Sequence, residues 1–158
     1  MKRNAGFTLV EVLVVLAVMA IMTVIAMPSL ISFRKNAEFG EAARGIASAL
    51  REARSRAVSR NLEYRVFFNV ANSRYILQQG NSSNGSSVWT PVYTSWVTFP
   101  PEVTMAAPGS CENTTTNRSI QFNPNGTANQ VYICVMDGTK KKFRIGVNFA
   151  TTGRVLIE

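Results

Sequence analysis

FTLVEVLVVLAVMAIMTVIAM, Phe7 to Met27, is the stretch that decides the fold. Its only polar side chains are the hydroxyls of Thr8 and Thr23 and the carboxylate of Glu11. A helix of about twenty apolar residues spans a hydrocarbon core of about 30 Å. Two basic residues stand just before the stretch, as expected for a span whose positive flank stays in the cytoplasm. The sequence therefore predicts a transmembrane helix near the N-terminus.

Glu11 is the anomalous residue of this helix. A charged side chain near the centre of a membrane helix costs about 2.5–3.5 kcal/mol on insertion scales, and less near an end. An ionisable residue in such a place usually has a function and a cationic partner. We therefore expect Glu11 to meet a positive group.

A cleaved secretory signal and a plain membrane anchor each explain part of this segment. Lys2 and Arg3 followed by apolar residues are typical of a signal peptide. The apolar run is, however, long for a signal peptide, and no small-x-small cleavage site follows it. A plain anchor explains the length but leaves Glu11 unexplained.

The order Gly6-Phe7-Thr8-Leu9-Val10-Glu11 after a short basic leader resembles the class III signal of type IV pilins and type II secretion pseudopilins. The resemblance implies that a prepilin peptidase cuts between Gly6 and Phe7 and methylates the new N-terminus. It also implies a pilin-like fold, a leader of residues 1–6, a transmembrane and assembly helix of residues 7–33, and a periplasmic head of residues 34–158.

Cleavage would supply the cation that Glu11 lacks. It creates an ammonium group at Phe7, and in stacked subunits this group of one chain can approach the Glu11 carboxylate of another. Pairing offsets much of the cost of a buried carboxylate, so we expect Glu11 to set the register between subunits more than to add net stability. Pro28 ends the apolar run, and a kink is expected there because proline removes a backbone donor.

A second apolar pattern continues the helix beyond Pro28. Apolar residues recur at spacings of four and three, which predicts one buried stripe on a helix that ends near Asn61. The stripe consists of Phe39, Ala43, Ile46, Leu50, Ala53 and Ala57. The other faces of this helix are rich in arginine.

The remainder of the chain is typical of antiparallel strands, so the predicted class is α+β. The predicted strands are Tyr64–Val70, Tyr75–Leu77, Val92–Phe99, Ser119–Phe122, Gln130–Val135, Lys142–Asn148 and Arg154–Ile157. Asp137-Gly138 predicts a hairpin turn. Gly80–Ser87 is expected to be a flexible loop, and Ala106–Asn117 a loop that holds Cys111.

Three features of the soluble half resemble the FimT and FimU minor pilins and the GspH pseudopilins. They are the arginine-rich helix end at residues 49–58 (ALREARSRAV), the turn FNPNG at 122–126 and TGRV at 152–155. The resemblance implies a minor subunit that primes or caps a type IV pilus or a type II secretion pseudopilus. Its partners would be other pilin or pseudopilin subunits, the prepilin peptidase and the bacterial inner membrane.

Residue usage excludes most catalytic chemistry. The chain has no histidine, which removes Ser-His-Asp and Cys-His catalysis and most zinc sites. No group of carboxylates converges in the sequence, so we expect neither an enzyme nor a metal or cofactor site. Cys111 and Cys134 form no CxxC motif. Outside the cytoplasm one disulfide would join them, and two separate buried thiols are the alternative.

The net charge of +8 favours anionic partners or a soluble basic surface. The densest basic run is Lys140-Lys141-Lys142 with Arg144, at the predicted hairpin, and Arg154 lies on the neighbouring predicted strand. Some FimT-like relatives bind DNA during natural transformation through arginines after the C-terminal Gly-Arg. In this chain only Arg154 stands there, and the lysine run could substitute, because non-specific binding needs only phosphate neutralisation. DNA binding is therefore the alternative function, and a solvated hairpin is the simpler interpretation.

Overall fold

The computed structural model describes residues 8–107, 111–112, 114–147 and 152–158. The predicted cleavage site, Gly6 and Phe7, lies outside these residues. The chain divides into two compact units, residues 1–37 and 38–158.

One long helix, α1, runs from Leu9 to Arg60 and thus contributes to both units. At its start, the Thr8 hydroxyl accepts a hydrogen bond from the Glu11 backbone N–H, with 3.2 Å between Glu11 N and Thr8 Oγ1. A Thr followed three residues later by Glu is the capping-box pattern. At its end, Asn61 takes a left-handed conformation with φ of 52°, which Asn tolerates better than most residues. Pro28 does not end the helix, and the kink expected there stays a prediction.

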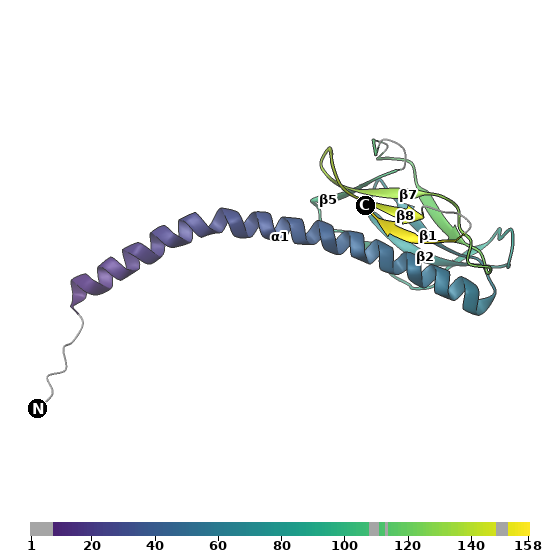
Figure 1. Ribbon diagram of the computed structural model, residues 1–158, viewed down its shortest axis with the longest axis horizontal. Coiled ribbons are helices and arrows are strands. Elements are labelled where there is room, and N and C mark those ends of the chain that lie inside the picture. Colours follow the sequence, from purple (N-terminus) through teal and green to yellow (C-terminus); the bar gives the residue numbers. More distant parts are fainter. Residues whose placement is uncertain (1–7, 108–110, 113, 148–151) are drawn as a thin grey trace, which may run out of the picture. The chain divides into compact units, whose positions relative to one another are not determined.

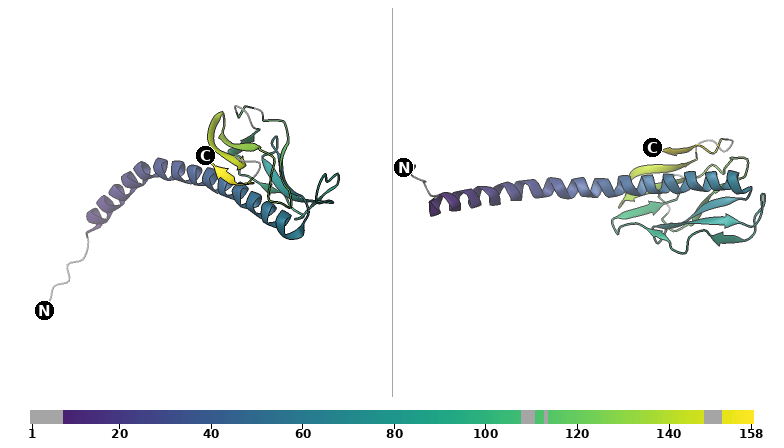
Figure 2. Two further views of the ribbon diagram at one scale, coloured as in Figure 1. Left: turned by 45° about the vertical axis from the view of Figure 1, so that its right-hand side comes forward. Right: turned by 90° about the horizontal axis from the view of Figure 1, so that it is seen from below.

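Within residues 38–158, the predicted apolar stripe of α1 is buried against the β-rich part of the chain (Figures 1 and 2). All six predicted residues are buried, together with Ala42 and Ala47. Alanines dominate the stripe and allow the helix to pack closely on the strands beneath it. The strand residues Val66, Ile120 and Ile133 belong to the same core.

The first sheet follows α1 and has five strands. They are β1 (Tyr64–Asn69), β2 (Arg74–Gly80), β3 (Trp89–Pro91), β4 (Val97–Thr98) and β6 (Arg118–Phe122). The order is β3-β2-β1-β6, with β4 also paired to β2, and all pairings are antiparallel. Tyr64, Val66 and Phe68 alternate into the core, so Arg65 and Phe67 belong to the outer face.

The second sheet has four antiparallel strands in the order β5-β7-β8-β9. They are β5 (Val103–Ala106), β7 (Tyr132–Asp137), β8 (Lys140–Val147) and β9 (Val155–Ile157). Gly138, with φ of 58°, lies in the predicted turn between β7 and β8. The predicted α+β class, a long N-terminal helix on antiparallel sheets, is thereby confirmed.

The predicted strand Val92–Phe99 is wrong. Two short strands, β3 and β4, pair with opposite ends of β2, and the residues between them leave the ladder. Tyr93 lies in this excursion, and its hydroxyl bonds a carboxylate oxygen of Glu52 on α1 at 2.6 Å. Contact with the helix, which sequence alternation cannot show, therefore replaces regular pairing here.

Two loop predictions also need correction. Ala106 is the last residue of β5, a four-residue strand that follows Pro100-Pro101 and was missed because it is so short. Gly80 ends β2, and the loop after it is held by Glu63 instead of being free. The Glu63 carboxylate accepts backbone N–H groups from Gly85 at 3.0 Å and from Ser86 at 2.6 Å.

Candidate functional site

The apolar part of α1 is exposed in the single chain. Large apolar side chains between Leu9 and Phe33 have exposed fractions of 47% to 77%. By length and composition this segment can cross a membrane. Glu11 lies in the first turn, where a negative charge also interacts favourably with the helix dipole. Glu11 thus has a local capping geometry, whereas its exposed apolar neighbours require lipid or other helices.

The two cysteines form a disulfide, with 5.8 Å between their Cα atoms. Cys134 is buried in β7, in a small cluster with Ala106 and Met136. The bond fastens the segment after β5 to the middle of the second sheet. The disulfide alternative of the sequence analysis is therefore the one that the structure contains.

The lysine run lies at the hairpin between β7 and β8, as predicted. Lys140 and Lys141 are exposed, whereas the ammonium of Lys142 lies 3.7 Å from a carboxylate oxygen of Asp137. The Arg144 guanidinium stacks 3.9 Å from the centre of the Tyr132 ring and lies 3.8 Å from a Glu158 carboxylate oxygen. Half of the predicted basic run is thus already in contact with the chain's own side chains.

Arg154 does not join the lysine run. It directly precedes β9, and Val155 pairs with Val147 at the far end of β8 from Lys140. An eight-residue strand is about 25 Å long, so the two basic groups are a strand's length apart. The lysine run and Arg154 therefore lie apart on the head, and DNA binding by these residues stays a prediction.

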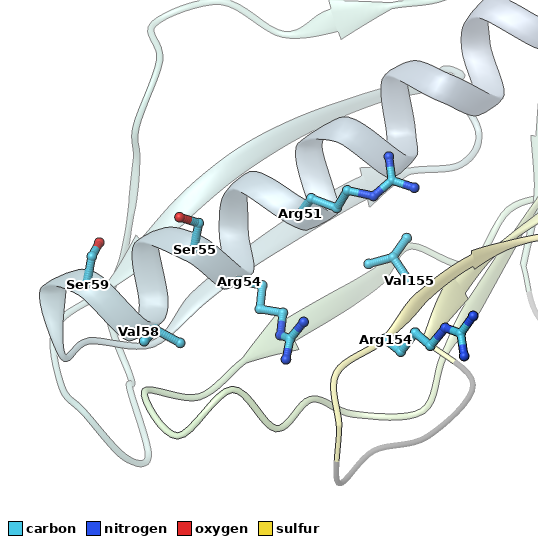
Figure 3. Close-up of a pocket in the computed structure, with 7 residues that line it drawn as sticks. All are labelled: Arg51, Arg54, Ser55, Val58, Ser59, Arg154 and Val155. Atoms are coloured by element: carbon cyan, nitrogen blue, oxygen red, sulfur yellow. The ribbon is translucent and has the colours of Figure 1, made fainter.

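Arg154 instead lines a cleft of about 580 Å³ together with two arginines of α1 (Figure 3). Arg51, Arg54, Ser55, Val58 and Ser59 line the helix side, and Arg154 and Val155 line the other. The helix residues follow the spacing i, i+3, i+4, i+7 and i+8, which places them on one face. The cleft therefore combines three guanidinium groups with two hydroxyls and a small apolar area. We call it the arginine cleft.

Two glycine turns shape the wall of the arginine cleft. Gly126 and Gly153 both have positive φ, at 81° and 57°. A Cβ on Gly153 would overlap the carbonyl oxygen of Gly126 and lie 3.3 Å from Arg54 Nε. The backbones of the turns FNPNG and TGRV are thus in contact at these two glycines, and the Arg54 side chain lies against them.

The arginine cleft is electrically uncompensated. In the part of the chain that the structure describes, no carboxylate lies within ion-pair distance of Arg51, Arg54 or Arg154. Guanidinium groups bind carboxylate or phosphate through paired hydrogen bonds. The described residues hold no group of His, Cys, Asp or Glu that fits a metal ion. The chemistry available here is anion binding.

Comparison with known proteins identifies the family. Residues 42–151 match the model of the type II transport protein GspH, which is well over half of the chain. This chain belongs to the GspH family. Residues 1–27 also match the prokaryotic N-terminal methylation motif. No curated protein matches the chain in sequence.

Solved structures agree on the fold of this GspH-family protein. The minor pseudopilin EpsH from the type 2 secretion system of Vibrio cholerae is 13% identical, with a TM-score of 0.58 over 76% of this chain and 94% of that chain. The type IV minor pilin FimU of Pseudomonas aeruginosa is 17% identical, with a TM-score of 0.56 over 80% and 92%. The predicted pilin superfamily and fold are confirmed. The two matched proteins are a minor pseudopilin and a minor pilin, and this chain shares their fold.

Sequence reasoning missed the arginine cleft of this GspH-family protein. The sequence shows that the other faces of the helix are rich in arginine, but no local pattern connects Arg51 and Arg54 with Arg154. The sequence does show that Arg51 and Arg54 are one turn apart and so share a helix face. It also shows Gly126 and Gly153 in the turns FNPNG and TGRV, which resemble those of the family. Only the tertiary fold brings those turns to that face.

Proposed function

We propose that this protein is processed between Gly6 and Phe7, methylated at Phe7, and inserted through α1 into a helical bundle with other pilin-type subunits. The head, residues 34–158, then lies in the periplasm, and the chain primes or caps the fibre. The observation that supports this proposal best is the apolar stretch from Leu9 to Phe33, whose large apolar side chains are exposed and which is interrupted by Glu11 in its first turn.

Glu11 serves two roles in this proposal. Within the chain it occupies the capping position opposite Thr8. Between chains its carboxylate pairs with the ammonium that cleavage creates on a neighbour. The bond to Thr8 is made by the backbone N–H of residue 11, so both Glu11→Gln and Glu11→Leu keep it and lose only the pairing between chains.

The test compares Glu11→Gln, Glu11→Leu and the control Thr23→Val in cells that process the chain. Thr23 bonds only its own helix, with Oγ1 2.7 Å from the Met19 carbonyl oxygen. We expect all variants to insert in the membrane and the control to assemble normally. Glu11→Gln and Glu11→Leu should both be depleted from sheared fibres or tip complexes. Normal incorporation of both would overturn the role of Glu11.

The type of fibre is tested by deletion in the host. We expect loss of the chain to reduce either surface pili or secretion of type II substrates, with restoration by the intact gene. Restoration by a chain in which Gly6 is replaced by Leu, with the leader retained, would contradict the proposed processing.

A second candidate function is duplex DNA binding for uptake, and the arginine cleft is the observation that favours it. Three unpaired guanidiniums suit phosphate oxygens. Replacing Arg51, Arg54 and Arg154 by Gln should weaken duplex binding. The slope of log affinity against log salt should fall by about 0.9 for each phosphate that the variant no longer neutralises. The control is Lys140→Gln with Lys141→Gln, and unchanged binding by the arginine variant would exclude the cleft.

A further inference from the structure

The outer face of the first sheet carries a ladder of alternating rings and guanidinium groups. Arg65 stacks 4.1 Å from the centre of the Trp89 ring and lies 5.5 Å from that of Phe67. Phe67 meets Trp96 edge to face at 6.1 Å, and Arg74 lies 4.5 Å from the Trp96 ring. We call these five residues, in the order Trp89, Arg65, Phe67, Trp96 and Arg74, the aromatic–arginine ladder.

The ladder draws on four strand segments but forms one row. Arg65 and Phe67 alternate outward from β1, and Arg74 lies opposite Asn69 on the same face of β2. Trp89 begins β3, and Trp96 directly precedes β4. All five side chains are partly exposed. The row therefore crosses the sheet and remains accessible from solvent.

Part of the ladder has a structural purpose. Ile76 lies opposite Phe67 on the outer face, yet only 4% of it is exposed, so the rings cover it. Covering one isoleucine does not require two arginines among the rings. Burial lowers the pKa of Arg65, which means that this cation is held in an unfavourable environment without a counter-charge.

The charged side chains within the strands of the first sheet are all cationic. The five strands of the first sheet contain Arg65, Arg74 and Arg118 and no Asp or Glu. Among the described residues neither Arg65 nor Arg74 has a carboxylate partner, and the buried Nε–H of Arg74 has no hydrogen-bond acceptor. Opposite Arg65 on the two neighbouring strands, Gln78 Oε1 accepts a hydrogen bond from Arg65 Nε at 2.7 Å, and the Gln121 side chain bonds the Glu63 carboxylate.

We propose that the aromatic–arginine ladder binds single-stranded DNA. Bases stack on the Trp89 and Trp96 rings, and the phosphates lie against Arg65 and Arg74. Rings on a sheet face together with cations are how proteins hold unpaired strands, because successive bases stack on the rings. In a duplex the bases are stacked on one another, so the ladder selects single strands.

This inference stands apart from the proposed assembly and from the arginine cleft. The cleft offers no aromatic ring among its lining residues, and its cations neutralise phosphates of duplex and single strand alike. The ladder adds rings, and rings require exposed bases. Failure at the ladder therefore leaves the assembly role and the cleft unaffected.

Intrinsic fluorescence gives a direct test, because the chain has only two tryptophans and both belong to the ladder. The full chain, in an uncharged detergent, is titrated with a short oligo-dT at low salt. The expected result is saturable quenching that weakens as salt is added. A duplex of the same length and an abasic strand with the same phosphates should bind at least about tenfold more weakly. Equal affinity for the abasic strand would overturn the proposal.

Variants locate the binding. Trp96→Tyr with Arg65→Gln should reduce oligo-dT affinity at least about tenfold, measured by anisotropy of a labelled strand. Lys140→Gln with Lys141→Gln removes charge on the second sheet and should change affinity far less. Thermal unfolding of both variants confirms that they are folded. Loss of binding in the control pair alone, or equal quenching by an acidic polysaccharide without bases, would contradict the ladder as a single-strand site.

Discussion

Replacing Glu63 by Ala should lower the free energy of unfolding of the head by about 3 kcal/mol. Glu63 is the buried carboxylate of the head, with 2% of its surface exposed. Its oxygens receive the backbone N–H groups of Gly85 and Ser86, and its own backbone pairs with Gly80 and Ser82. The side chain and backbone together hold the loop that leads from β2 to Trp89.

The magnitude follows from those two hydrogen bonds. A hydrogen bond to a charged group contributes about 1.5–3 kcal/mol, so the two backbone bonds together correspond to about 3–6 kcal/mol. The loop is partly exposed, so water can reach the freed N–H groups. The expected loss of stability is therefore at the lower end of this range. Glu63→Gln keeps one acceptor oxygen but places an NH₂ group against one of the two backbone N–H groups. We therefore expect it to lower the free energy of unfolding by about 2 kcal/mol.

The pH dependence has a definite sign. Burial alone would raise the pKa of Glu63, but hydrogen bonds from Ser86, Gly85 and Gln121 outweigh it, and the pKa is lowered. The stabilisation is fully present above the pKa of an unfolded glutamate, about 4.3. It is lost as the pH falls through the lower pKa of the folded state. Glu63→Gln should therefore destabilise the head at neutral pH and lose less stability than the wild type below about pH 4.

The assay is urea unfolding of residues 34–158, a fragment that contains the whole described core, followed by circular dichroism at several pH values. The exposed glutamate Glu41 provides the control, and Glu41→Gln should change stability by less than about 0.5 kcal/mol. A loss below about 1 kcal/mol for Glu63→Ala would refute the reasoning. Parallel pH curves for Glu63→Gln and the wild type would refute it too.

Three further predictions concern the same head, measured by urea or thermal unfolding. Replacing both Cys111 and Cys134 by Ala should lower the free energy of unfolding by about 3 kcal/mol, because the disulfide closes a loop with a sequence separation of 23. An unchanged stability of the wild type after reduction of the disulfide would contradict this. Gly138 also has a positive φ but open space around it, so Gly138→Ala should lower the free energy of unfolding by about 1–2 kcal/mol. Gly153→Ala should lower it more, because its Cβ would overlap the Gly126 backbone, and equal losses would contradict this reason. Tyr93→Phe removes a hydroxyl that bonds Glu52 and Arg56 at an exposed site and should cost about 1 kcal/mol or less, and a much larger loss would mean that the excursion between β3 and β4 depends on this contact.

The sequence predicted the elements whose pattern is local. The stripe from Phe39 to Ala57, the helix end at Asn61, and the alternation of Tyr64, Val66 and Phe68 all depend on spacing within one element. Each therefore appears in the structure where spacing placed it.

The errors lie where tertiary contacts decide. The Val92–Phe99 segment has strand composition, but Tyr93 leaves the sheet to bond Glu52. The sequence places the lysine run and Arg154 on neighbouring strands, and these strands do pair. Arg154, however, lies beside the end of β8 that is far from Lys140. The arginine cleft and the aromatic–arginine ladder depend on residues that are distant in sequence, so no local pattern predicts them.

The central claim is that Glu11 pairs with the N-terminal ammonium of an adjacent subunit, and zero-length cross-linking tests it most directly. A membrane-permeant carbodiimide joins a carboxylate to an amine only when the two are in contact. Assembled fibres are treated, digested and analysed by mass spectrometry, with isotope-labelled subunits to separate contacts between chains from those within one. The account predicts a peptide that joins Glu11 to the N-terminal residue of a neighbouring subunit, and its absence after the same treatment of cells that express the Glu11→Gln chain. An unmodified Glu11 in fully processed and assembled fibres, with other carboxylates cross-linked, would contradict it.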